Sequence, residues 1–147
     1  MTKSIKIAVV IFLVVGVIGF LDATYLTVEH YRGNIPPCTI QGCEVVLTSE
    51  QSKIFGVPVA LLGALYYLVI LILSVSFLDG KKEGVIRFAS RLTFLGFIAS
   101  VYFVYLQFFV IGEICQYCMI SAGTSTLLFV LGIYILIKTR QSKVVQY

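Results

Sequence analysis

Four long hydrophobic runs limit what this chain can fold into. They cover approximately residues 7–26, 55–77, 92–111 and 119–137, more than half of a chain of 147 residues. A run of about 18 or more apolar residues is long enough to cross a bilayer as a helix, and these runs are too long for barrel strands. We therefore predict an all-α integral membrane protein. It is a four-helix bundle in a single domain, residues 1–147, with a long outer loop between the first two helices.

Composition supports a membrane protein. The chain is 59% hydrophobic and 12% charged, whereas soluble domains average about 45–50% apolar and about 25% charged residues. A soluble core of this size cannot hide so much apolar surface, but a bilayer can cover it.

Basic residues predict how the chain crosses the membrane. Nine of the 11 lie before the first run, between the second and third, or after the fourth: Lys3, Lys6, Lys81, Lys82, Arg87, Arg91, Lys138, Arg140 and Lys143. Short loops rich in Lys and Arg stay in the cytoplasm, so we expect both termini there and all four cysteines on the outer side. The net charge of +4 thus indicates topology and contact with anionic lipid, not nucleic-acid binding.

The first run could instead be a cleaved signal peptide, because Lys3 and Lys6 give it a basic start. Its apolar stretch is longer than a signal core, and its exit, Leu21 to Tyr25, lacks a small-x-small cleavage site. An uncleaved anchor is therefore favoured.

One pair of cysteines opens the last run. Cys115 and Cys118 form a C-x-x-C motif, which alone can be redox-active, structural or metal-binding. A helix N-terminus favours the thiolate, the reactive form of cysteine. At the membrane edge such a thiol can meet a lipid-soluble molecule, which favours redox chemistry.

The second pair, Cys38 and Cys43, lies in the long outer loop. A disulfide that closes so short a loop adds little to the stability of the fold and is better suited to thiol–disulfide exchange. We expect an exposed loop pair that meets soluble proteins and passes electrons to the inner pair. Two inert structural disulfides, or a four-thiolate zinc site, are the alternatives. An oxidising compartment disfavours zinc because the ligands would oxidise first.

Polar residues near the outer ends of the runs are harder to interpret. Ser121, Thr124, Ser125 and Thr126 could line a cavity or hydrogen-bond to neighbouring helices, and these two interpretations are equally favoured. Asp22 lies close to the outer end of the first run, where it could simply reach water; a proton-handling role has little support.

Nearly the whole chain resembles the vitamin K epoxide reductase family, in a bacterial or archaeal DsbB-like form without a fused thioredoxin domain. The resemblance is carried by the two cysteine pairs and three further motifs: Ser49 after Cys43, Phe55-Gly56-Val57-Pro58 leading to Gly63, and Tyr25-Leu26-Thr27. It implies a four-helix bundle around a quinone pocket, in the inner (cytoplasmic) membrane with the cysteines facing the periplasm or exterior. The quinone is ubiquinone, menaquinone or vitamin K, with no metal expected.

The resemblance also implies roles for individual residues. Cys115 and Cys118 are the active-site pair, with Cys118 nearest the quinone, and Cys38 and Cys43 are the loop shuttle. Ser49 and Ser52 are expected at the quinone pocket. Ala122 stands where animal members have a tyrosine, which argues against epoxide reduction.

We therefore predict a thiol:quinone oxidoreductase that reoxidises a thioredoxin-like partner of the DsbA type on the outer side and supports disulfide formation. The chain carries no thioredoxin-like domain of its own, so a separate partner is expected. Reduction of vitamin K quinone or epoxide is one alternative. A structural membrane scaffold with two inert disulfides is another, from a different class.

Overall fold

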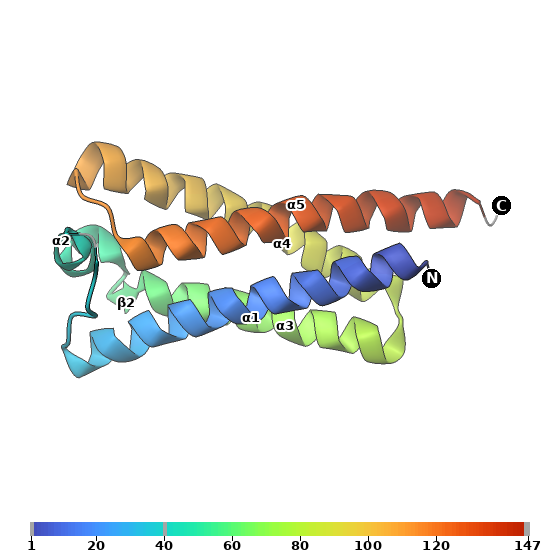
Figure 1. Cartoon of the computed structure of the whole chain (residues 1–147), viewed down its shortest axis with the longest axis horizontal. Coiled ribbons are helices and arrows are strands. Elements are labelled where there is room, and N and C mark those ends of the chain that lie inside the picture. Colours follow the sequence, from blue (N-terminus) through green and yellow to red (C-terminus); the bar gives the residue numbers. More distant parts are fainter. Residues whose placement is uncertain (1, 40, 146–147) are drawn as a thin grey trace.

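Four long helices dominate the computed structural model, which describes residues 2–39 and 41–145. They are α1 (Lys3–Arg32), α3 (Val59–Gly80), α4 (Glu83–Tyr105) and α5 (Gln116–Val144). The helices run side by side, with both ends of the chain at one end of the bundle (Figure 1). Each is long and apolar enough to cross a membrane, α4 together with the π-helical turn η2 (Leu106–Ile111) that continues it. The predicted four-helix membrane bundle is thus confirmed.

The helices extend beyond the hydrophobic runs. α4 begins nine residues before the run at 92–111, and α5 continues through Lys138, Arg140 and Lys143, which we had expected to follow the last span. A hydrophobic run marks the length in contact with lipid, whereas a helix continues until a residue ends it. α1 ends at Gly33, which takes a left-handed conformation with φ of 73°.

Short elements in the long loop cover the end of the bundle opposite the termini (Figure 1). They are α2 (Cys43–Thr48), the 3-10 turn η1 (Glu50–Ser52), and the antiparallel strands β1 (Lys53–Ile54) and β2 (Val57–Pro58). Residues 43–52 therefore form two short helical segments. The hairpin formed by β1 and β2 precedes α3, which therefore begins at Val59 and not at Phe55.

Small residues allow the helices to approach closely. Gly19 of α1 lies against the ring of Tyr67 on α3, and Gly96 of α4 lies against the hydroxyl of Tyr66. Tyr67 is also fixed to α5, because its hydroxyl donates to the carbonyl oxygen of Ser121 (2.8 Å) and is hydrogen-bonded to the hydroxyl of Thr124 (2.8 Å). These contacts hold α1, α3, α4 and α5 together in the half of the bundle that the loop elements cover, where the candidate site lies.

Candidate functional site

The loop cysteines are joined in a disulfide. Cys38 follows two prolines, Cys43 is the first residue of α2, and their Cα atoms are 6.4 Å apart. Cys43 is only 2% exposed, whereas Cys38 is half-buried. The pair is therefore less exposed than we expected, because α2 folds down onto the bundle. Of its two sulfurs, that of Cys38 is the more accessible from outside.

The second pair lies at the start of α5, as its position in the sequence predicted. Cys115 caps the helix, Cys118 is in its first turn, and both are free thiols. A hydrogen bond with Cys118 lowers the pKa of Cys115 to about 7. Burial opposes this change, because Cys115 is fully buried. Its backbone N–H donates to Gln107 Oε1 at 2.9 Å, which fixes the cap to η2.

The fold brings the two pairs together. Cys43, Val46 and Cys115 form one buried cluster, against which Cys38 and Cys118 pack. The cluster forms because α2 lies against η2 and the beginning of α5. Thiol–disulfide exchange requires one sulfur to reach another, and this cluster provides that proximity.

Two residues between Cys115 and Cys118 hold the loop in place. Gln116 Oε1 accepts a hydrogen bond from the backbone N–H of Thr39 (3.3 Å), and the Tyr117 hydroxyl donates to the carbonyl oxygen of Pro37 (2.7 Å). Both partners flank Cys38. Nothing in the sequence indicated this role apart from the position of the two residues inside the motif.

Gly42 allows the loop to lie closely against the cap of α5. Its φ of 121° is in the region that favours glycine, and a Cβ there would lie 3.2 Å from the carbonyl oxygen of Ile114. A side chain at this position would push α2, and with it Cys43, away from Cys115.

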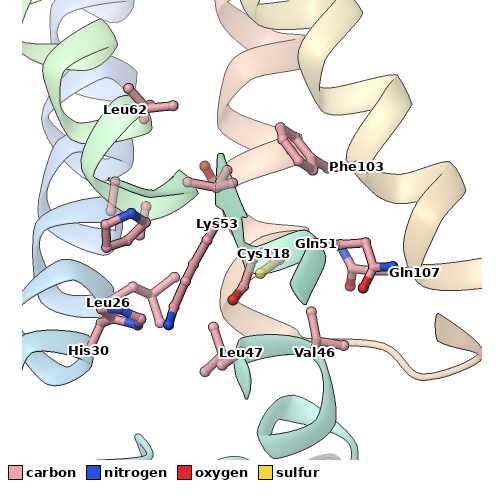
Figure 2. A pocket seen from close by; sticks show the side chains of 18 of the residues that line it. Leu26, His30, Val46, Leu47, Gln51, Lys53, Leu62, Phe103, Gln107 and Cys118 are labelled. Atoms are coloured by element: carbon pink, nitrogen blue, oxygen red, sulfur yellow. The ribbon is translucent and has the colours of Figure 1, made fainter. Parts of the chain in front are cut away.

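A cavity of about 690 Å³ lies in the half of the bundle that the loop elements cover, bounded by α1, α3, α4, α5 and these elements. Its volume is typical of small-molecule sites, which range over about 300–1,000 Å³. Cys118 lies on its wall, among Leu26, Val46, Leu62 and Phe103 (Figure 2). The cavity therefore brings one thiol of the inner pair to an apolar compartment.

Both serines expected at a quinone pocket line this cavity. However, the Ser49 hydroxyl donates to the carbonyl oxygen of Val46 (2.7 Å), and the Ser52 hydroxyl donates to that of Ser49 (2.6 Å). A hydroxyl has one proton to donate. In this conformation both protons are used inside the loop, so the two serines shape the cavity wall without offering a free donor.

The polar start of α5 combines both interpretations offered above. Ser121 and Ser125 line the cavity, whereas Thr124 bonds to Tyr67 of α3. Thr126 donates to the carbonyl oxygen of Ala122 in its own helix. Asp22 is half-buried, and its Oδ2 is inaccessible to solvent and has no hydrogen-bond partner in the described part of the chain.

The cavity wall suits a quinone, which is a flat apolar ring with acceptor oxygens. Aliphatic and aromatic side chains form most of the wall, and the buried hydroxyls of Tyr66 and Ser125 lack hydrogen-bond partners among residues 2–39 and 41–145. Over the same residues no group of three or more His, Cys, Asp or Glu side chains is placed to hold a metal ion.

Comparison with known proteins gives two matches. The model of the vitamin K epoxide reductase family matches residues 10–133. The chain is also 35% identical over 122 residues to "Thiol-disulfide oxidoreductase LTO1" of Arabidopsis thaliana, an alignment that covers 77% of this chain and 32% of the relative. The chain therefore spans about a third of the length of that relative. Together the matches support a thiol oxidoreductase role.

Proposed function

The chain belongs to the vitamin K epoxide reductase family, and on that premise we propose that it is a membrane thiol:quinone oxidoreductase. It oxidises a thioredoxin-like partner of the DsbA type and thereby supports disulfide formation. One observation carries the proposal. All four cysteines lie in one cluster, in which Cys38 is accessible from the loop side and Cys118 faces the apolar cavity.

The first exchange takes place at the loop pair. A thiolate of the reduced partner attacks the sulfur of Cys38, the Cys38–Cys43 bond breaks, and Cys43 leaves as a thiolate. The second thiolate of the partner then breaks the mixed disulfide, so the partner leaves oxidised and Cys38 becomes a thiol. The greater exposure of Cys38 compared with Cys43 supports this direction of attack.

The second exchange passes the electrons inward. The Cys43 thiolate attacks Cys115 of an oxidised Cys115–Cys118 pair, a Cys43–Cys115 bond forms, and Cys118 is released as a thiolate. Cys38 then attacks Cys43, which restores the loop disulfide and releases Cys115. The product has a Cys38–Cys43 disulfide and two thiols at 115 and 118, the same pairing that the structure contains.

The cavity is where the electrons leave the protein. A bound quinone supplies the acceptor for the two electrons and two protons that are released when the Cys115–Cys118 disulfide forms again. Cys118 lies on the wall of the cavity, most of the wall is apolar, and Gln107 holds the backbone of Cys115 in place. Members of the family use quinones, which supports this assignment; ubiquinone, menaquinone and vitamin K all remain candidates.

We also propose an orientation for the chain, as one domain in the inner (cytoplasmic) membrane. Both termini lie at the end of the bundle remote from the cysteines (Figure 1), and basic residues gather toward that same end. Since basic segments stay in the cytoplasm, the cysteines face the periplasm or exterior, where the partner is found.

Quinol formation by the purified protein tests the function. With a reduced DsbA-type protein and ubiquinone or menaquinone, we expect quinol to form and the partner to become oxidised. Cys118→Ala should abolish quinol formation because it removes the thiol that faces the cavity. Ile120→Ala is the matched control, because this side chain is on the same helical turn but is 42% exposed on the outer surface.

The same assay separates the alternatives. Turnover of vitamin K epoxide in place of the quinone would favour epoxide reduction. Failure of a folded protein to reduce any of these quinones would contradict the proposal and favour a structural scaffold.

A further inference from the structure

Two buried hydroxyls on the cavity wall have no role in the electron path described above. Tyr66 Oη belongs to α3 and Ser125 Oγ to α5. Both oxygens are inaccessible to solvent, and neither has a hydrogen-bond partner in the described part of the chain. A buried hydroxyl without a partner is costly, so these two atoms indicate a missing acceptor.

The two hydroxyls lie beside each other, where α3, α4 and α5 meet. A Cβ built on Gly96 of α4 would overlap the Tyr66 hydroxyl and would lie 3.0 Å from Ser125 Oγ. Glycine at position 96 therefore leaves the space that the pair occupies. Even if a small rotation let one hydroxyl donate to the other, the second proton would remain free, because each hydroxyl has one.

The pair differs from the neighbouring polar groups. Tyr67, the next residue along α3, is hydrogen-bonded to both Ser121 and Thr124. Ser49 and Ser52 already donate to carbonyl oxygens within the loop. Tyr66 and Ser125 thus line the cavity with hydroxyl protons that no other residue of the described chain accepts, although the two oxygens lie just behind the wall surface.

Their position complements that of Cys118. Ser125 follows Cys118 by seven residues on α5, which is two turns or about 10 Å along the helix axis. Ala122, one turn from each, lines the cavity and has no polar atom in its side chain. Along this row of α5 the cavity therefore has a thiol at Cys118, a methyl group at Ala122, and the hydroxyl of Ser125 deeper in the bundle.

We propose that Tyr66 and Ser125 form a donor pair that turns toward the cavity when a quinone enters, binds the carbonyl oxygen remote from Cys118 and so positions the ring for reduction. This inference rests on the proposed function. Quinone oxygens are acceptors, so they require donors, and a ring held at its far edge presents its near edge to the thiol. Tyr66 and Ser125 act as positioning residues and exchange no electrons themselves.

Quinone binding in the absence of turnover tests the pair. Protein with both cysteine pairs oxidised is given a short-chain ubiquinone or menadione, and the dissociation constant and the infrared carbonyl stretching band of the bound quinone are measured. In the wild type we expect one carbonyl band at a lower frequency than in free quinone. Tyr66→Phe combined with Ser125→Ala should remove that change and raise Kd by about 3- to 10-fold, the usual effect of one hydrogen bond.

Two control variants match these changes outside the cavity. Tyr102→Phe removes a phenol from the exposed face of α4, and Ser90→Ala removes another buried hydroxyl that lacks a partner among the described residues. Neither should alter the carbonyl band or Kd. Gly96→Ala keeps both hydroxyls but displaces Tyr66, and in folded protein it should also weaken the band change.

The outcomes distinguish the two proposals. Wild-type quinol formation together with an unchanged carbonyl band and Kd in the double variant would overturn the donor pair and leave the enzyme function intact. Absence of quinone binding by the folded wild type would overturn both.

Discussion

At the scale of single residues, Cys115 has the most specialised environment. It is fully buried, its N–H is held by Gln107, and its sulfur is hydrogen-bonded with Cys118. Burial alone would keep the proton on the thiol. The bond with Cys118 outweighs burial and lowers the pKa of Cys115 to about 7. The inner pair therefore holds a reactive thiolate near neutral pH, although it is shielded from solvent.

This environment predicts a pH titration. In the reduced inner pair, thiolate ultraviolet absorbance should rise with a midpoint at about pH 7. Cys118→Ala removes the main cause, so its midpoint should move up toward the ordinary 9.0. Because folding lowers this pKa, the thiolate stabilises the reduced fold above pH 9 and this contribution is lost as the pH falls through 7. Identical midpoints in the two proteins would contradict this account.

The residues that could be predicted from the sequence are those whose chemistry is local. The cysteine pairs are recognisable from their spacing, and the N-terminal position of Cys115 follows from the start of the last hydrophobic run. The roles of Gln107, Gln116 and Tyr117 could not be predicted, because each side chain is hydrogen-bonded to the backbone of another segment. Their roles exist only after the helices have packed.

At the scale of elements, the crossing of α1 and α3 depends on a glycine. Gly19 lies so close to the Tyr67 ring that a Cβ would overlap it, and Tyr67 is 1% exposed and bonded to α5. Adding a methyl group must move either the ring or the helix. The crossing thus couples α1 to both α3 and α5.

Gly19→Ala should therefore destabilise the bundle by about 1–3 kcal/mol, the usual cost of overpacking a core. Gly123→Ala is the matched control, since a Cβ at that helical position meets nothing within 4 Å, and its effect should stay within about 1 kcal/mol. Unfolding in detergent micelles, followed by circular dichroism, measures both. Equal stability of the two variants would show that the contact is not tight.

Among the elements, the long helices were predictable and the hairpin was not. Hydrophobic runs of this length form helices in lipid, because a helix satisfies its own backbone hydrogen bonds. Residues 55–58 are apolar as well, so the sequence placed them in the second span. They form a turn and a strand instead, because Phe55 and Gly56 adopt positive φ of 50° and 79°, a conformation that hydrophobicity does not reveal.

At the scale of the whole molecule, the proposed function requires one order of sulfur contacts. Cys43 and Cys115 belong to the same buried cluster, so their sulfurs are the natural junction between the two pairs. Cys38 and Cys118 lie at opposite ends of the route, one toward the loop surface and the other toward the cavity.

A disulfide trapped between Cys43 and Cys115 tests this order of sulfur contacts. In Cys38→Ala combined with Cys118→Ala, only Cys43 and Cys115 remain, and we expect them to form a disulfide in high yield under mild oxidation. The reciprocal variant, which retains only Cys38 and Cys118, should stay mostly as thiols. Mass spectrometry of peptides digested without reductant reports both yields. If Cys38 and Cys118 instead formed a disulfide in higher yield than Cys43 and Cys115, the proposed order of sulfur contacts would be wrong.

Burial of Cys43 and Cys115 also has a consequence for the cell. A small hydrophilic thiol such as glutathione can approach Cys38, but fully buried sulfur and an apolar cavity separate it from the electron acceptor. On the proposed function, a thiol outside the protein therefore does not meet the quinone directly, and its electrons enter only through the Cys38–Cys43 disulfide.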